Sequence, residues 1–257
     1  MVSICIPTYE NVVFLKRALD SAVVQEGVEF EIVISDDSRT TEVEQLVKQY
    51  SFPIRYFRNE KPIGSPGNWN AAVDRAESDI IHLLHHDDAY YSHDSLQRML
   101  SPIKNGKKIT FSECLWSPYQ KINCYRRGAT VDTFARLKQG FLGDLFAVNF
   151  LSVPSTMLYR RDQSVRYDES FINMVDVDFY LTMIRENGVE AVEMVEGPCV
   201  VVNIESDFQV TNSLVSEKLK REEWARFYQK WSPFLIEIGA DPEQLYQKAL
   251  IHQGLTK

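Results

Sequence analysis

The first hundred residues alternate short apolar runs with stretches of helical periodicity, and few folds accommodate that pattern. Four apolar runs have the length of buried strands, at residues 2–6, 30–34, 54–57 and 80–84. Each is followed by apolar residues at helical spacing, at 13–22, 43–50, 68–76 and 94–103. Strands that alternate with helices form a parallel sheet covered on both faces. We therefore predict an α/β, Rossmann-like fold with a mostly parallel central sheet flanked by helices.

The rest of the chain is less regular. We expect strands at 109–115, 155–159, 190–195 and 200–204, an aromatic and basic loop at 116–127, and helices at 131–146 and 177–185. Beyond residue 211 the sequence becomes helical and amphipathic. Its apolar residues recur on one face, at Leu214, Leu219, Trp224, Phe227 and Trp231.

Composition excludes some partners and compartments. The chain has 257 residues with 28 Lys+Arg against 36 Asp+Glu, a net charge of −8. Binding to nucleic acid phosphates requires a basic surface, so we expect no nucleic acid partner. No run of 18 apolar residues and no signal peptide is evident, and the four cysteines form no C-x-x-C pair. These features predict a cytoplasmic protein with free thiols.

Polar residues follow three of the four predicted N-terminal strands. They are residues 7–11 after the first strand, Asp36, Asp37 and Ser38 after the second, and residues 85–88 after the fourth. In open parallel sheets, ligands bind at the carboxyl ends of the strands. We therefore expect these three turns to meet at one edge of the sheet.

The turns contain no glycine-rich phosphate loop. Neither G-x-G-x-x-G nor G-x-x-x-x-G-K-[ST] occurs, so a bound diphosphate would need another source of positive charge. The adjacent carboxylates of Asp87 and Asp88 could hold Mg²⁺ or Mn²⁺, which prefer oxygen ligands. The alternative for both aspartates is simple turn or helix-cap chemistry.

Four histidines lie within a dozen residues of this pair, but their spacing matches no familiar zinc motif. We expect His82 to point into the sheet, and His85 or His86 to line a nucleotide pocket.

Five segments in order resemble glycosyltransferase family 2, whose members are inverting, metal-dependent enzymes with the GT-A fold and nucleotide-sugar donors. The segments are residues 2–9, 30–38, 64–76, 80–88 and 176–179. The resemblance implies a GT-A domain at 1–210 with a C-terminal helical extension at 211–257. Within the domain, 1–104 would bind the nucleotide sugar and 105–210 the acceptor.

The resemblance also implies roles for individual residues. Asp176 matches the general base, with Asp178 as its local competitor, and Asp88 matches the ligand of the divalent metal. Asp37 matches the aspartate that accepts from the N3–H of uracil or thymine, which favours UDP-sugars, or less strongly dTDP-sugars. The implied nucleotide-binding residues are Pro7, Thr8, Tyr9, Glu10, Asp37, Asn70, His86 and Asp87.

The acceptor is implied to be a glycan or a lipid-linked glycan of bacterial surface polysaccharide biosynthesis. Its expected binding residues are Trp116, Arg126, Ser155 and Thr156, since aromatic faces suit sugars and arginine suits a diphosphate. The C-terminal helical stripe has three interpretations: core packing, contact with a second copy in a homodimer, or peripheral contact with the inner face of the cell membrane.

The sequence departs from the family pattern at several positions. His85 stands where many members have aspartate, Trp69 replaces an arginine, Val175 replaces a glutamate, and no late histidine occurs near 203–209. A catalytically silent nucleotide- or glycan-binding relative is therefore a second hypothesis. A sugar nucleotidyltransferase is the third, and the missing glycine-rich loop disfavours it.

Overall fold

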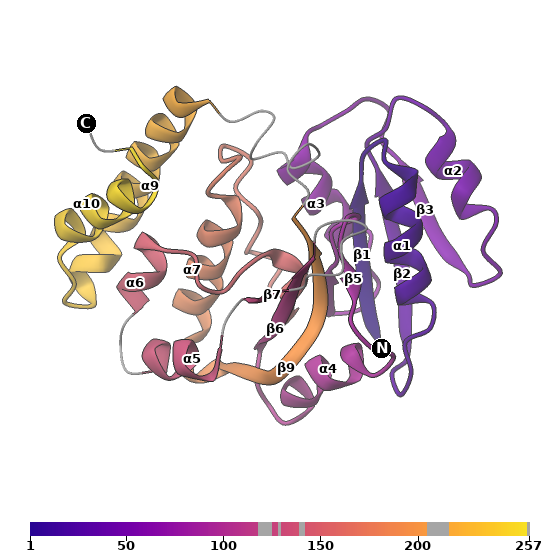
Figure 1. Ribbon diagram of the computed structural model, residues 1–257, viewed down its shortest axis with the longest axis horizontal. Helices are drawn as coiled ribbons and strands as arrows, with labels where there is room; N and C mark the ends of the chain where they lie inside the picture. Colours follow the sequence, from indigo (N-terminus) through magenta and orange to yellow (C-terminus); the bar gives the residue numbers. More distant parts are fainter. Residues whose placement is uncertain (118–124, 128–129, 139–141, 205–215, 256–257) are drawn as a thin grey trace.

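A nine-stranded sheet forms the centre of the described part of the protein (Figure 1). The structure, a computed structural model, describes residues 1–117, 125–127, 130–138, 142–204 and 216–255. In chain order the strands are β1 (Val2–Thr8), β2 (Phe30–Asp36), β3 (Ile54–Arg58), β4 (Ile80–Leu83), β5 (Ala89–Tyr90), β6 (Ile109–Ser117), β7 (Tyr125–Arg127), β8 (Met157–Arg160) and β9 (Val192–Asn203).

The sheet is parallel where the sequence alternates strand and helix, and mixed elsewhere. Its order is β3-β2-β1-β4-β8-β6-β9-β5, with β7 paired to β6. The first four strands are parallel to one another, as predicted. Beyond them β8 runs antiparallel between β4 and β6, while β9 is parallel to β6. The predicted α/β class is confirmed. The mixed half of the sheet consists of strands that come later in the chain than the four parallel strands.

One strand, β9, replaces the two strands predicted at 190–195 and 200–204. Its pairing with β6 slips between Val195 and Pro198, where two extra residues form a bulge. Gly197 in this bulge has φ 79°, a conformation that glycine adopts without steric cost. The turn-like Glu-Gly-Pro sequence therefore bends the strand and does not end it.

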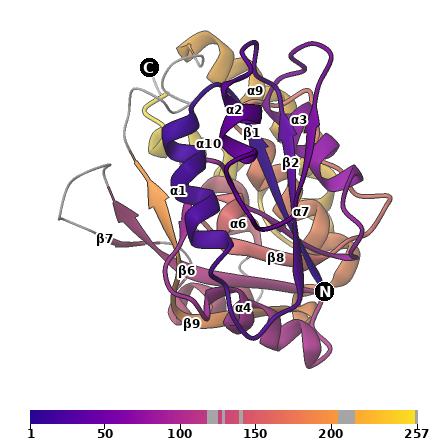
Figure 2. The same cartoon turned by 90° about the vertical axis from the view of Figure 1, so that its right-hand side faces the viewer.

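Helices cover both faces of the sheet (Figures 1 and 2). One face packs on α1, α2 and α4 through apolar side chains such as Leu15, Val43 and Met99. The other face packs on α3, α5, α6 and α7, with α9 and α10 outside them. The bounds are α1 (Val12–Ala22), α2 (Glu42–Val47), α3 (Ser65–Asp74), α4 (Ser95–Lys104), α5 (Val131–Lys138), α6 (Leu142–Ala147), α7 (Val175–Asn187), α9 (Glu217–Glu237) and α10 (Pro242–His252). Two short 3₁₀ turns, Pro154–Thr156 and Val189–Ala191, precede β8 and β9.

Two predictions for the middle of the chain were wrong in detail. The helix expected at 131–146 is two helices, α5 and α6, and residues 139–141 between them lie outside the described residues. The loop expected at 116–127 contains the end of β6 and all of β7.

The aromatic stripe of α9 belongs to the core. Trp224, Phe227 and Trp231 are each at most 2% exposed, and they share one apolar cluster with α6 and α7. Phe146 of α6 stacks on Phe227 with 5.0 Å between ring centroids. These three side chains are therefore not available to a membrane or to a second copy; Leu214 lies outside the described residues. None of the described helices has the length and apolar composition needed to cross a bilayer.

Candidate active site

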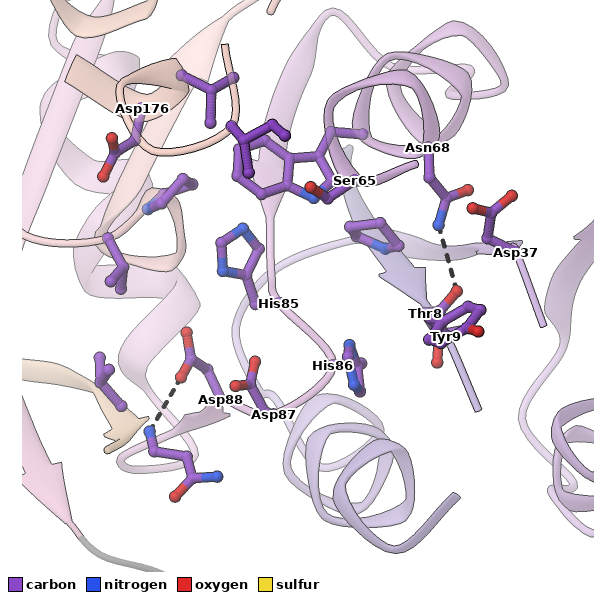
Figure 3. Close-up of a pocket in the computed structure, with 18 of the residues that line it drawn as sticks. Thr8, Tyr9, Asp37, Ser65, Asn68, His85, His86, Asp87, Asp88 and Asp176 are labelled. Atoms are coloured by element: carbon purple, nitrogen blue, oxygen red, sulfur yellow. Dashed lines mark hydrogen bonds between the residues drawn. The ribbon is translucent and has the colours of Figure 1, made fainter. Parts of the chain in front are cut away.

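A cavity of about 390 Å³ opens at the carboxyl ends of β1, β2 and β4, where the three polar turns meet (Figure 3). From there the cavity extends to the first turn of α7, which contains Val175 and Asp176. The predicted residues that line it are Pro7, Thr8, Tyr9, Asp37, His85, His86, Asp87, Asp88 and Asp176. The sequence therefore identified most of the polar wall of one cavity from residues far apart in the chain.

The turns after β1 and β2 form one wall of the cavity. Tyr9 is 45% exposed, so its ring offers an open face at the rim. Thr8 is buried, and its Oγ1 has no hydrogen-bond partner among the described residues. Asp37 is 4% exposed and its carboxylate accepts from the backbone N–H groups of Ile63 (2.9 Å) and Gly64 (3.0 Å). Backbone donors thus fix this carboxylate at the cavity wall.

Asn68, which sequence reasoning missed, joins this wall to the start of α3. Its Nδ2 donates to the carbonyls of Thr8 (3.2 Å) and Ser35 (3.0 Å), and it is buried at the cavity. Asn70, predicted to bind nucleotide, lies outside the cavity; its Nδ2 donates to the Tyr167 carbonyl at 2.9 Å. Residues two apart in a helix point about 200° apart, so only one of the two asparagines can face the cavity. Ser65, three residues before Asn68, lies on the cavity side with it.

Three side chains after β4 gather at the floor of the cavity: His85, Asp87 and Asp88 (Figure 3). Each offers one ligand atom, and these atoms lie within 4.8 Å of one another. Asp88 is 2% exposed, and burial together with the charge of Asp87 raises the pKa of its carboxyl. Burial lowers the pKa of His85 to about 4, so its imidazole is neutral near pH 7.

The residues beneath this floor hold it in place. The Ser155 hydroxyl accepts from the backbone N–H of His85 at 2.9 Å, and the Asn203 N–H donates to Asp88 Oδ1 at 3.1 Å. His82 points into the sheet as predicted, with its Nε2 2.8 Å from the Ser155 carbonyl. Ser155 and Thr156 were predicted to bind acceptor, but both are fully buried and outside the cavity lining. Ser155 supports the floor through its bond to the His85 N–H, whereas the Thr156 hydroxyl donates to the carbonyls of Leu151 and Val153.

Asp176 lies at the opposite side of the cavity, in the first turn of α7. Its Oδ2 accepts from Asn149 Nδ2 at 3.0 Å and its Oδ1 from the Val177 N–H at 2.8 Å. Burial raises the pKa of Asp176 to about 6, and these donors oppose the rise. A carboxylate with a pKa near neutrality is suited to accept a proton.

Asp178, the competing base, faces away from the cavity. It is 1% exposed, and its carboxylate accepts from Trp231 Nε1 and Lys230 Nζ, both of α9, at 2.9 Å. Glu223, also of α9 and fully buried, accepts from the N–H groups of Ile172 (2.7 Å) and Asn173 (2.8 Å). The helix α9 therefore holds the chain on both sides of Asp176.

Two further predicted residues, Glu10 and Trp116, lie outside the cavity lining. The Glu10 carboxylate accepts from the Arg39 N–H at 2.8 Å and so joins the loop after β2. Trp116 lies on β6, outside the cavity lining. Arg126 pairs with Leu115 through β7, and its side chain lies outside the described residues.

The donor set at the cavity floor fits a divalent cation. Neither Asp87 nor Asp88 forms an ion pair with a lysine or arginine in the described segments, although one of the two is nearly fully buried. Adjacent carboxylates without a protein counter-ion are costly unless a cation or protons compensate them. Carboxylate oxygens are also the ligands that Mg²⁺ and Mn²⁺ prefer.

The fold is that of the GT-A glycosyltransferases. The model described as "Glycosyl transferase family 2" matches residues 3–165, so this chain belongs to glycosyltransferase family 2.

Curated relatives agree with this assignment. The chain is 26% identical over 174 residues to the GalNAc(5)-diNAcBac-PP-undecaprenol beta-1,3-glucosyltransferase of Campylobacter jejuni, a match covering 66% of this chain and 55% of that protein. It is 36% identical over 95 residues to the abequosyltransferase RfbV of Salmonella typhimurium, covering 35% of this chain and 28% of that one. An uncharacterised protein of Mycobacterium tuberculosis matches 74% of this chain at 25% identity, and 63% of its own length is covered. The chain thus spans less than two thirds of these three relatives.

Solved structures show the same fold. The TarS fragment 1–349 of S. aureus in complex with UDP-GlcNAc superposes with a TM-score of 0.68 at 16% identity, covering 97% of this chain and 71% of that one. The mannosyltransferase PcManGT of Pyrobaculum calidifontis, in complex with GDP-Man and Mn²⁺, gives a TM-score of 0.60 at 13% identity, covering 98% and 69%.

Proposed function

We propose that this chain transfers a sugar, with inversion, from a UDP-sugar to a glycan or lipid-linked glycan of bacterial surface polysaccharide. The observation that carries the proposal is the position of Asp37, Asp88 and Asp176, which three separate segments bring to one cavity. The C. jejuni relative, named for a lipid-linked acceptor, supports that acceptor class. An acceptor of this kind would place the protein in the cytoplasm at the inner face of the membrane.

In this proposal the turns after β1 and β2 hold the uracil base of the donor. Tyr9 provides an open aromatic face for stacking, and Thr8 before it lines the same part of the cavity. Three donors hold the Asp37 carboxylate at this wall: Asn59 Nδ2, the Gly64 N–H and the Ile63 N–H, which is shared between the two oxygens. In this proposal the same carboxylate accepts the N3–H of uracil. Cytosine lacks this donor, so the site prefers uridine nucleotides over cytidine nucleotides.

Asp176 removes the proton from the acceptor hydroxyl as that oxygen attacks the anomeric carbon. Its pKa of about 6 leaves it mainly ionised near pH 7 while keeping it basic enough to accept a proton. Asn149 and the Val177 N–H orient its two oxygens. Asp88, with Asp87 beside it and near the ribose, would hold a divalent cation, and that cation would supply positive charge to the diphosphate leaving group.

The test combines binding with turnover. We expect UDP-sugars with Mn²⁺ to raise the melting temperature more than GDP-sugars do, and Asp176→Asn to keep this shift while losing transfer. Asp88→Asn should lose both. Stabilisation by GDP-sugars alone would overturn the role of Asp37. Binding without transfer or donor hydrolysis, across a panel of acceptors, would favour the silent relative instead.

A further inference from the structure

The ligand set at the cavity floor contains a nitrogen where the sequence pattern of the family has an oxygen. His85, Asp87 and Asp88 each bring one donor atom within 4.8 Å of the others. Ligand atoms around one octahedral cation lie about 3 Å apart when adjacent and about 4 Å apart when opposite, for bonds of about 2.1 Å. The three atoms are therefore close to the spacing that a single cation would impose, and small side-chain rotations complete it.

The imidazole of His85 is already held in position. Its backbone N–H is bound to Ser155 Oγ at 2.9 Å, and its ring packs on Trp69 with 4.7 Å between centroids. The Asn203 N–H donates to Asp88 Oδ1 at 3.1 Å, so backbone and hydroxyl groups of the protein fix both the histidine and the carboxylate. Residues that orient metal ligands in this way raise metal affinity. Figure 3 shows His85, Asp87 and Asp88 around the same part of the cavity, with His86 turned elsewhere.

The histidine ring is not used by the protein's own hydrogen bonds. Its Nε2 is buried without a partner among the described residues, and the ring makes no ion pair there. Asp87 and Asp88 likewise have no lysine or arginine partner in the described segments. Two carboxylates without a basic partner, beside an imidazole nitrogen without a hydrogen-bond partner among the described residues, are the arrangement expected for side chains that bind an external cation.

We propose that His85 is a direct ligand of the divalent cation, so that the site is a mixed histidine–carboxylate site. This inference rests on the metal site of the proposed function and deepens it. Imidazole favours Mn²⁺, Co²⁺ and Zn²⁺ over Mg²⁺, because Mg²⁺ prefers oxygen ligands and nitrogen donors follow the Irving–Williams order. The site therefore selects transition metals over Mg²⁺.

The experiment measures metal binding by the whole chain without any nucleotide, and so does not depend on transfer. Mn²⁺, Co²⁺ and Mg²⁺ are titrated separately into the wild type, His85→Ala and His85→Asp. We expect His85→Ala to weaken Co²⁺ and Mn²⁺ binding by about 10- to 100-fold. His85→Asp, with three carboxylates, should lower the preference for Co²⁺ over Mg²⁺ by about tenfold or more.

Pulsed EPR on bound Mn²⁺ provides a direct check. The wild type should show nitrogen hyperfine coupling that His85→Asp lacks and that His86→Ala and the exposed His93→Ala retain. Unchanged Co²⁺ affinity in His85→Ala, or loss of the coupling only in His86→Ala, would overturn the proposal. If Asp88→Asn abolishes binding while both His85 variants bind like the wild type, the inference fails and the proposed function stands. If the wild type transfers sugar but binds no metal without donor, the inference also fails.

Discussion

Asn149 donates a hydrogen bond of 3.0 Å to Asp176 Oδ2, and it is itself bound to the loop that leads toward β8. The same Nδ2 donates to the Ser152 carbonyl, and its Oδ1 accepts from the Leu151 N–H. This loop therefore fixes the orientation of the proposed base. A donor to the ionised carboxylate also stabilises its charged form, which lowers the pKa of Asp176.

We predict that Asn149→Ala moves the acid limb of the pH–rate profile to higher pH. In the wild type, kcat/KM should fall as pH drops through about 6, because protonated Asp176 cannot act as a base. Loss of the donor raises the pKa of Asp176, so the fall begins at higher pH. Asn187→Ala, at the far end of α7, is the matched control. An equal loss of rate at every pH would mean that Asn149 has only a structural role.

The ionised form of Asp176, which catalysis requires, should lower the stability of the folded protein. Its pKa in the folded state, about 6, exceeds its ordinary value of 3.8, so its ionisation costs stability as pH rises through this interval. We predict that Asp176→Asn raises the melting temperature by a few degrees near pH 7.5, and that the gain vanishes below about pH 4. The exposed Glu60→Gln is the matched control. A gain that persists at low pH would contradict the assignment.

The contact between Lys230 and Asp178 should contribute measurably to stability. Asp178 is 1% exposed, and removal of Lys230 leaves its charge held only by Trp231 Nε1. We expect Lys230→Met to lower the free energy of unfolding by about 1–3 kcal/mol, less than for a fully buried pair because Lys230 is partly exposed. Denaturant titrations in a double-mutant cycle with Asp178→Asn measure the coupling. Lys218→Met, in an exposed pair with Glu222, should cost well under 1 kcal/mol.

The two asparagines of α3 should separate binding from stability. Both are buried and bridge backbone groups, so Asn68→Ala and Asn70→Ala should each cost about 2–4 kcal/mol of folding free energy. Only Asn68 lines the cavity, so we expect only Asn68→Ala to weaken UDP binding beyond the effect of stability. Calorimetry under conditions where both variants are folded checks this. Equal weakening by both would mean that the position of Asn70 also matters for the nucleotide.

The parallel half of the fold was predictable because local sequence patterns identify its strands and helices. Helix α1 has clear apolar spacing, strands β1, β2 and β4 are mostly buried apolar runs that end in polar turns, and β3 is a half-buried strand at the edge of the sheet. Their carboxyl ends must share one edge, which is why Asp37 and Asp88 were found together. The mixed half depends on pairings between distant segments, such as β8 between β4 and β6, that no local pattern encodes.

Three predicted site residues lie outside the cavity lining for one shared reason. Asn70, Ser155 and Thr156 are polar residues near motif positions, and the fold uses their polar atoms for backbone hydrogen bonds inside the protein. Asn68 could have been found from its helical spacing to Ser65 at the start of α3. Asn149 and Glu223 carried no signal, because their partners lie 27 and about 50 residues away in the sequence.

The hold that α9 has on the segment around Asp176 has a consequence for synthesis of the protein. Glu223 and Lys230 of α9 come well after the residues that line the cavity, the last of which is Asn203. A nascent chain on the ribosome can thus assemble the nucleotide wall while the proposed base still lacks its support. Catalytic competence would arrive in a single late step, after residue 231 has left the exit tunnel and α9 has docked.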